Sequence, residues 1–360
     1  MIDKSLELLK PFEAEGIDAL FVVTPANQRY LEGFTGGDCF MLSTGKKNFL
    51  IADSRYLEMA QRECRNAEVV PHRAPNPPLH DVVASLAADN GLRRIGFEKD
   101  RLVWGLYDDI AKALSRAGAE LVPTSSLVEG IRARKSPEEA KKIEAACAIA
   151  DKALKDALPL VKAGISELDL KIELDYRLKT GGAEDAAFDT MVLFGARPSQ
   201  PHASSRRDVP LAPGDFILID YGACLDGYRS DTTRTFVFGR ASGEQKAAYS
   251  AVLKSQEESL RMVAPGANGR EINDMALGII RGRGLPAFEY GIGHGVGLEI
   301  HEVPFMRQNT DVLLETGMVV TIEPGSYKPD WGGIRIEDTV LVTPDGHRAL
   351  TRFPKELMEL

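Results

Sequence analysis

Three stretches of the chain share one pattern, an apolar run typical of a β-strand that ends in a carboxylate. The runs read FILID, VVTIE and GIRIE, and they end at Asp220, Glu323 and Glu337. Apolar runs of this length predict buried strands, and a carboxylate buried without a partner is costly. A fold that accepts the pattern three times must bring these side chains to a place where their charge is compensated.

The first run continues into a predicted hairpin. Asp226 and Gly227 form a turn signal between it and a second strand-like stretch. With those two residues at the turn, Asp220 faces Thr233, and Asp231 is the diagonal neighbour on the same face. Two carboxylates so close are unfavourable unless one is protonated or a cation lies between them, which favours a metal site. For the hairpin alone, a solvated end with surface aspartates is an equally good interpretation.

A glycine-rich segment contains the next candidate. The sequence YGIGHGVG at residues 290–297 places His294 among four glycines, where missing side chains let backbone and ligand approach closely. The segment lacks the glycine spacing of a dinucleotide fingerprint and the Lys-Ser/Thr pair of a P-loop, which argues against a nucleotide site. Taken alone, a histidine in such a loop is usually structural.

Together these residues resemble the pita-bread metallopeptidase family, which includes methionine aminopeptidase, aminopeptidase P and prolidase. Asp220, Asp231, His294, Glu323 and Glu337 have the family's ligand types in the family's order. The resemblance implies that Asp220 chelates one metal ion, that Asp231 and Glu337 bridge two ions, and that His294 and Glu323 complete the second. Mainly oxygen ligands favour two divalent ions of Mn²⁺ or Co²⁺, with Zn²⁺ as a third candidate.

The resemblance also assigns roles around the ions. His202 and His301 match family positions near the substrate, where they are expected to stabilise the oxyanion or transfer a proton; a structural histidine near a strand end is the alternative. Glu323 is the expected proton shuttle. Arg335 lies two residues before Glu337, on the same strand face, and is expected to steady a ligand carboxylate or the substrate.

Two domains of an α+β chain are expected. Residues 1–127 alternate strand-like and helix-like stretches and resemble the α/β creatinase-type N-terminal domain, and residues 128–360 form the pita-bread domain. In the first domain the patterns predict strands at 19–23, 40–43, 48–52, 68–71, 94–97 and 120–123 and helices at 55–64, 80–90 and 104–117.

The second domain is expected to be a duplicated unit of two helices followed by antiparallel strands. Ser136 and the Pro-Glu-Glu after it predict a capped helix that runs to about Val161. Residues 161–182 then resemble residues 263–284 at an offset of 102, with Ser166 and Asn268 as helix caps. Chance similarity between two amphipathic helices is the alternative.

Composition narrows the class of partner and the compartment. With 53 acidic and 44 basic side chains, the net charge of −9 argues against nucleic acid or an anionic membrane as the main partner. The four cysteines form no C-x-x-C pair, and we find no signal peptide and no apolar run long enough to span a membrane. We therefore predict a cytoplasmic protein.

The substrate is predicted from the resemblance to be a peptide with proline at its second position. Methionine aminopeptidase generally lacks the long N-terminal domain, and creatinase lacks the metal ligands. Phe305 stands where some microbial prolidases carry an arginine, so aminopeptidase P is favoured over prolidase, although Arg307 is a candidate substitute. A non-catalytic peptide-binding protein of the same fold is the alternative from another class. The family also leads us to expect a homodimer.

Overall fold

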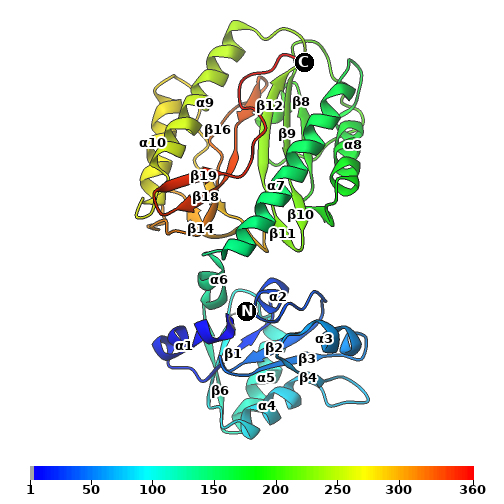
Figure 1. The fold of residues 1–360 in the computed structure, drawn as a ribbon, viewed down its shortest axis with the longest axis vertical. Helices are drawn as coiled ribbons and strands as arrows, with labels where there is room; N and C mark the ends of the chain where they lie inside the picture. The colour runs from blue at the N-terminus through cyan, green and yellow to red at the C-terminus, as the bar shows by residue number, and fades with distance from the viewer. Residues whose placement is uncertain (1–3) are drawn as a thin grey trace. The chain divides into compact units, whose positions relative to one another are not determined.

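The computed structural model describes residues 4–360, and the chain divides into two compact units, Met1–Arg132 and Ala133–Leu360 (Figure 1). We refer to them as the N-terminal unit and the C-terminal unit.

The N-terminal unit is built on a six-stranded mixed sheet with the order β4-β3-β2-β1-β5-β6. All six predicted strands are confirmed within one residue at each end, as β1 (Ala19–Val22), β2 (Phe40–Ser43), β3 (Asn48–Ala52), β4 (Glu68–Pro71), β5 (Arg94–Glu98) and β6 (Glu120–Thr124). The predicted helices are also present, and the unit contains η1 (Lys4–Leu8), α1 (Leu9–Glu15), α2 (Pro25–Glu32), α3 (Leu57–Glu63), α4 (Leu79–Asp89), α5 (Trp104–Arg116) and α6 (Leu127–Arg132). Apolar residues of α4 and α5 pack with strand residues into one buried core.

Four long helices flank the strands of the C-terminal unit: α7 (Pro137–Ala157), α8 (Glu167–Thr180), α9 (Gly243–Met262) and α10 (Gly269–Arg281). The predicted start of α7 is confirmed, since Ser136 and Glu139 form a reciprocal capping box. Its predicted end at Val161 is wrong: the α-helix stops at Ala157, and a short 3₁₀ turn, η2 (Leu158–Leu160), follows. Pro159 explains the difference, because it has no N–H to donate to the carbonyl four residues earlier, so the hydrogen-bond pattern of the α-helix cannot continue through it.

The strands of the C-terminal unit form several small antiparallel sheets. The sheet orders are β12-β9-β8, β11-β10-β7, β14-β13-β15-β18-β19 and β16-β17. The strands are β7 (Asp185–Ala186), β8 (Met191–Phe194), β9 (Phe216–Tyr221), β10 (Ala223–Leu225), β11 (Tyr228–Arg229), β12 (Thr232–Val237), β13 (Gly293–Gly295), β14 (Glu302–Met306), β15 (Val319–Ile322), β16 (Gly325–Lys328), β17 (Gly332–Arg335), β18 (Asp338–Thr343) and β19 (Gly346–Ala349), with η3 (Arg197–Ser199) after β8.

The predicted hairpin has the predicted register. Asp226 and Gly227 have φ angles of 49° and 74°, as a turn with two left-handed residues requires. Asp220 pairs with Thr233 across β9 and β12. The second strand of the hairpin is not continuous, because Asp231 lies between β11 and β12.

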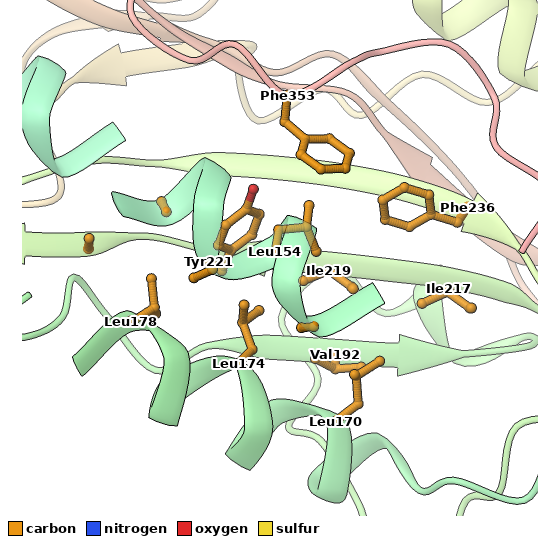
Figure 2. Close-up of a cluster of buried hydrophobic side chains, with 14 of the residues drawn as sticks. Leu154, Leu170, Leu174, Leu178, Val192, Ile217, Ile219, Tyr221, Phe236 and Phe353 are labelled. Carbon is orange, nitrogen blue, oxygen red and sulfur yellow. The ribbon is translucent and has the colours of Figure 1, made fainter. Parts of the chain in front are cut away.

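A large apolar core fixes β9 against the first helix pair. Leu170, Leu174 and Leu178 on α8 point towards the sheet, where Ile217 and Ile219 of β9 lie (Figure 2). The repeat of three to four residues on α8 and of two residues on β9 puts these side chains on one face of each element. Burying this face holds β9 in place, and with it the strand end that carries Asp220.

The two halves of the C-terminal unit repeat their local geometry. Gly164 and Gly266 both have positive φ angles, 83° and 84°, and Ser166 and Asn268 both accept a capping hydrogen bond at the start of α8 and α10. Their glycine N–H groups donate to equivalent later carbonyls, of Leu211 at 2.9 Å and Leu314 at 2.8 Å. These matches support the predicted duplication, and Figure 1 shows α7 with α8 and α9 with α10 as two pairs.

Within residues 4–360, none of the helices has the length and apolar content needed to cross a bilayer. The four cysteines, Cys39, Cys64, Cys147 and Cys224, are free thiols.

Candidate metal centre

Strand ends in the C-terminal unit bring the predicted ligands together. Asp220 is the penultimate residue of β9, His294 is in the middle of β13, and Glu323 directly follows β15. Asp231 precedes β12, and Glu337 lies between β17 and β18. Asp231, His294 and Glu337 are buried, and each offers one ligand atom within 4.8 Å of the others. Among the residues that the structure describes, this is the one group with such spacing.

The imidazole of His294 is oriented by its surroundings. Its Nδ1 lies 3.1 Å from the carbonyl oxygen of Gly295, and its Nε2 lies 3.5 Å from Asp231 Oδ2 and 3.1 Å from Glu323 Oε1. With the Nδ1 proton directed at the Gly295 carbonyl, Nε2 is the ring nitrogen that faces the carboxylates and that a bound cation would use. Thr321 joins the two ligands, since its hydroxyl accepts from the backbone N–H of His294 and donates to Glu323 Oε1, both at 3.1 Å.

In two of the carboxylates, Asp220 and Glu337, only one of the two oxygens accepts a hydrogen bond. Arg335 Nη2 donates to Asp220 Oδ2 at 2.5 Å, and the Thr233 hydroxyl donates to Glu337 Oε2 at 2.7 Å. The other oxygens, Asp220 Oδ1 and Glu337 Oε1, are buried without a hydrogen-bond partner. A buried oxygen normally has a hydrogen-bond partner. A divalent cation can take the place of that partner, because carboxylate oxygens are good ligands for such ions. The donor set therefore fits a hard or borderline divalent metal ion.

The pKa values of the clustered carboxylates also indicate that the site favours a bound cation. Burial, followed by the charge of neighbouring carboxylates, raises the pKa of Asp231 and Glu337 well above the ordinary range. Burial also raises the pKa of Glu323, but the hydrogen bond and charge of His294, together with the charge of Arg335 and the hydrogen bond of Thr321, outweigh it, and the pKa is lowered overall. Without cations, Asp231 and Glu337 are therefore driven towards the protonated state, whereas bound cations favour their ionised form.

A buried arginine that we did not predict supports the site. Arg234 donates to Asp338 Oδ1 at 2.8 Å, to the Thr233 carbonyl at 3.0 Å and to the Glu337 carbonyl. The pair is almost fully buried, with side chains 1% and 2% exposed. Its one sequence signal is a charge inside the otherwise uncharged strand TTRTFV. Arg234 thus ties β12 to the segment that carries Glu337.

The two predicted substrate histidines are more exposed than the ligands. The ring of His301 lies 4.4 Å from that of His294, centre to centre, in an edge-on arrangement. Loss of hydration, and then the charges of His294 and His202, lower the pKa of His301. His202 lies in the exposed loop after η3. The ring of His301 is thus at the periphery of the cluster, and His202 is near enough for its charge to act on His301.

The hydrogen-bond donors of the Arg335 side chain are used by contacts within the protein. The residue is 5% exposed, and its guanidinium donates to Asp220, to the Thr233 hydroxyl at 2.8 Å and to the Tyr327 hydroxyl at 2.9 Å. All three sides of the planar group are therefore engaged. The hydrogen bond to Asp220 is the contact that the first of its two predicted roles, steadying a ligand carboxylate, requires, and both roles stay predictions. We did not predict Tyr327, which has no local sequence signal.

Comparison with known families identifies the chain. The profile described as metallopeptidase family M24 matches residues 141–344, and the profile described as the creatinase/prolidase N-terminal domain matches residues 6–134. The chain belongs to metallopeptidase family M24. This M24 peptidase is therefore a hydrolase of peptide bonds, and its family implies divalent metal ions.

Relatives of this M24 peptidase include proteins named for Xaa-Pro substrates. It is 34% identical over 364 residues to the Xaa-Pro dipeptidase of Pyrococcus horikoshii, covering 99% of each chain. It matches the structure of an Xaa-Pro dipeptidase from Bacillus anthracis with a TM-score of 0.93 and 36% identity over 99% of each chain. It also matches an X-Pro aminopeptidase from Thermotoga maritima with a TM-score of 0.90 and 31% identity over 100% of each chain.

Proposed function

We propose that this M24 peptidase is an Xaa-Pro dipeptidase that hydrolyses the bond before proline with the help of two divalent metal ions. The observation that carries the proposal is the buried group of Asp231, His294 and Glu337, with Glu323 3.1 Å from His294 and with two buried carboxylate oxygens, of Asp220 and Glu337, lacking partners. The ligands are Asp220, Asp231, His294, Glu323 and Glu337, and the ions are Mn²⁺ or Co²⁺, with Zn²⁺ as the third candidate.

In peptide hydrolysis the metal ions and the side chains would have separate roles. Bound divalent ions would acidify a water molecule and polarise the scissile carbonyl. Glu323 engages His294 and Thr321 through Oε1, so its Oε2 is the atom that would take the proton of the water and deliver it to the proline nitrogen. His301 and His202, which are exposed, would donate to the carbonyl oxygen as negative charge develops.

Choosing the dipeptide over longer peptides reverses our expectation from sequence. Two of the relatives described above are named Xaa-Pro dipeptidases, which favours the prolidase alternative. The absence of an arginine at Phe305 had favoured aminopeptidase P. That reading remains the second candidate, because the Thermotoga maritima relative is named an X-Pro aminopeptidase.

Arg307 offers the positive charge that a dipeptide carboxylate needs. Phe305 pairs with His294 across β13 and β14, and residues directly opposite each other point to the same sheet face. The guanidinium carbon of Arg307 lies 5.1 Å from the centre of the Phe305 ring, and Nε donates to Thr310. Among the described residues Arg307 has no carboxylate partner, so its terminal nitrogens remain available for the substrate carboxylate.

A substrate comparison tests the proposal. With Mn²⁺, Co²⁺ or Zn²⁺, we expect hydrolysis of an Xaa-Pro dipeptide to exceed that of the Xaa-Pro-Yaa tripeptide in kcat/KM. Because a charge-assisted contact is lost, Arg307→Met should lower kcat/KM for the dipeptide by about 10- to 100-fold and change the tripeptide value by less than about 3-fold. The exposed Arg283→Met is the matched control.

Two results would overturn the proposal. Preference for the tripeptide would assign aminopeptidase P activity instead. No turnover of either peptide with any of the three metals would favour the peptide-binding protein.

Location and assembly remain predictions. We expect a cytoplasmic protein, in keeping with its four free thiols and net charge of −9. We also expect a homodimer, which sedimentation equilibrium would test.

A further inference from the structure

The loop that carries His301 has no regular secondary structure to hold it. Residues 296–301 connect β13 to β14 as a series of bends. His301 is the last residue of this loop and is exposed, whereas Glu302 directly after it is buried. The position of the imidazole therefore depends on what fixes the loop.

The Glu302 carboxylate fills the inside of the loop. Its Oε2 accepts from the backbone N–H of Glu299 at 3.3 Å. A Cβ at Gly297 would lie 2.3 Å from Glu302 Oε1, so the carboxylate packs against the bare Cα of that glycine. The loop is thus folded around one buried negative charge.

Lys135 neutralises that charge. Its Nζ lies 2.7 Å from Glu302 Oε1 and donates to the Ala133 carbonyl at 3.2 Å, and the two side chains are 1% and 2% exposed. The backbone of Lys135 is itself fixed, because its N–H donates to the Gly317 carbonyl at 2.8 Å. A pair so completely removed from water holds its geometry tightly, since separating it leaves a buried charge unpaired.

Arg229 holds the loop at a second place. Its backbone N–H donates to the Gly297 carbonyl at 2.9 Å, and its Nε donates to the Leu298 carbonyl at 3.3 Å. The loop is therefore restrained both through Glu302 and through its own carbonyl groups.

We propose that Lys135 and Glu302 are positioning residues that hold His301 at the site of hydrolysis. The inference rests on the proposed function, in which His301 meets the scissile carbonyl. The pair contacts no substrate and acts through the loop, so loosening it moves the imidazole while leaving the ligand set intact. A displacement of about 1 Å at a reacting group is enough to cost up to about 10²-fold in rate.

The kinetic test uses the double variant Lys135→Met/Glu302→Gln, which leaves no buried charge and keeps an acceptor for the Glu299 N–H. We expect kcat to fall by about 10-fold, with KM and bound metal changed by less than about 2-fold. In a His301→Ala background the same double substitution should lower kcat by less than about 2-fold, because its effect passes through His301. An equal loss in both backgrounds would overturn the proposal.

The adjacent exposed pair provides a matched control. Arg134 and Glu315 form an ion pair of 3.1 Å with side chains 56% and 54% exposed. Arg134→Met/Glu315→Gln should leave kcat unchanged in both backgrounds, because exposed pairs contribute little.

Amide hydrogen exchange tests the loop independently of activity. We expect faster exchange at residues 297–302 in Lys135→Met/Glu302→Gln, and wild-type exchange there in the control and at β9 in both variants. Unchanged exchange in the loop would overturn the proposal even if the enzyme is active. If the wild-type protein hydrolyses no Xaa-Pro substrate, the exchange result still decides whether the pair holds the loop, and the failure lies with the proposed function.

Discussion

Both units bury carboxylates, but they satisfy them differently. In the N-terminal unit Glu98 accepts four hydrogen bonds: from Val23 N at 2.7 Å, from Thr24 N at 2.8 Å, from the Thr24 hydroxyl at 2.9 Å and from Asn27 Nδ2 at 2.5 Å. In the C-terminal unit Asp220 and Glu337 each keep one buried oxygen without a partner. All the hydrogen bonds that the first carboxylate needs come from the protein, whereas a bound cation would supply the partner that the other two lack.

A raised pKa does not distinguish the carboxylate of the N-terminal unit from those of the metal centre. Burial raises the pKa of Glu98, as it raises the pKa of Asp231 and Glu337. One partnerless oxygen is not decisive either, since Asp151 and Asp175 have one each. The difference lies in clustering, because several incomplete carboxylates around an imidazole are stable together only with an added positive charge.

The largest expected effect comes from removing a bridging carboxylate. Asp231→Asn should lower kcat/KM by at least about 10³-fold because the site loses a ligand. The same variant should unfold at an equal or higher temperature than the wild type when both are free of metal, because repulsion with Glu337 and Asp220 is relieved. Peptide hydrolysis and calorimetry measure the two effects. If Asp231→Asn clearly lowered the stability of the metal-free protein, the Asp231 carboxylate would have to be stabilised by protein groups, as Glu98 is.

The opposite result is expected in the N-terminal unit. Glu98→Gln places an amide N–H₂ among groups that donate hydrogen bonds, and should lower the free energy of unfolding of that unit by about 2–3 kcal/mol. Urea denaturation followed by a probe in that unit measures the loss. Glu58→Gln, at an exposed ion pair with Arg62, is the control and should change it by less than about 0.5 kcal/mol. A negligible loss for Glu98→Gln would remove the contrast between the units.

The smallest effect concerns a second carboxylate of the N-terminal unit, Asp53. A hydrogen bond from Arg55 lowers the pKa of Asp53 to about 2, against an ordinary value of 3.8. A lowered pKa stabilises the fold above the ordinary value, and this contribution is lost as the pH falls from about 4 through about 2. Asp53→Asn should therefore lower Tm at pH 6, and the difference from wild type should shrink towards pH 2. A constant difference would mean that the ion pair with Arg55 does not stabilise the unit.

Local rules explain which features the sequence could predict. The turn at Asp226 and Gly227 sets the register, so the pairing of Asp220 with Thr233 follows from residues a few positions apart. The end of α7 was also predictable, because Pro159 carries the signal that we did not use. The strand-end carboxylates stand out because each interrupts an apolar run.

The features that the sequence could not predict depend on pairs of residues far apart along the chain. Arg234 meets Asp338 across 104 positions, and Lys135 meets Glu302 across 167. No periodicity or turn signal connects such segments, and, apart from the charge of Arg234 inside its uncharged strand, each residue alone resembles an ordinary surface charge. Glu98 is the same kind of case, since its donors at Val23 and Thr24 come from another strand end.

Metal binding measured together with stability tests the central claim most directly. After equilibration with Mn²⁺ and removal of free ions, the wild-type chain should hold about two ions, and chelation should lower its Tm by several degrees. Glu337→Gln should hold fewer ions, and its Tm should respond little to chelation. Wild-type protein that binds no Mn²⁺, Co²⁺ or Zn²⁺ and keeps the same Tm with and without chelator would contradict the account.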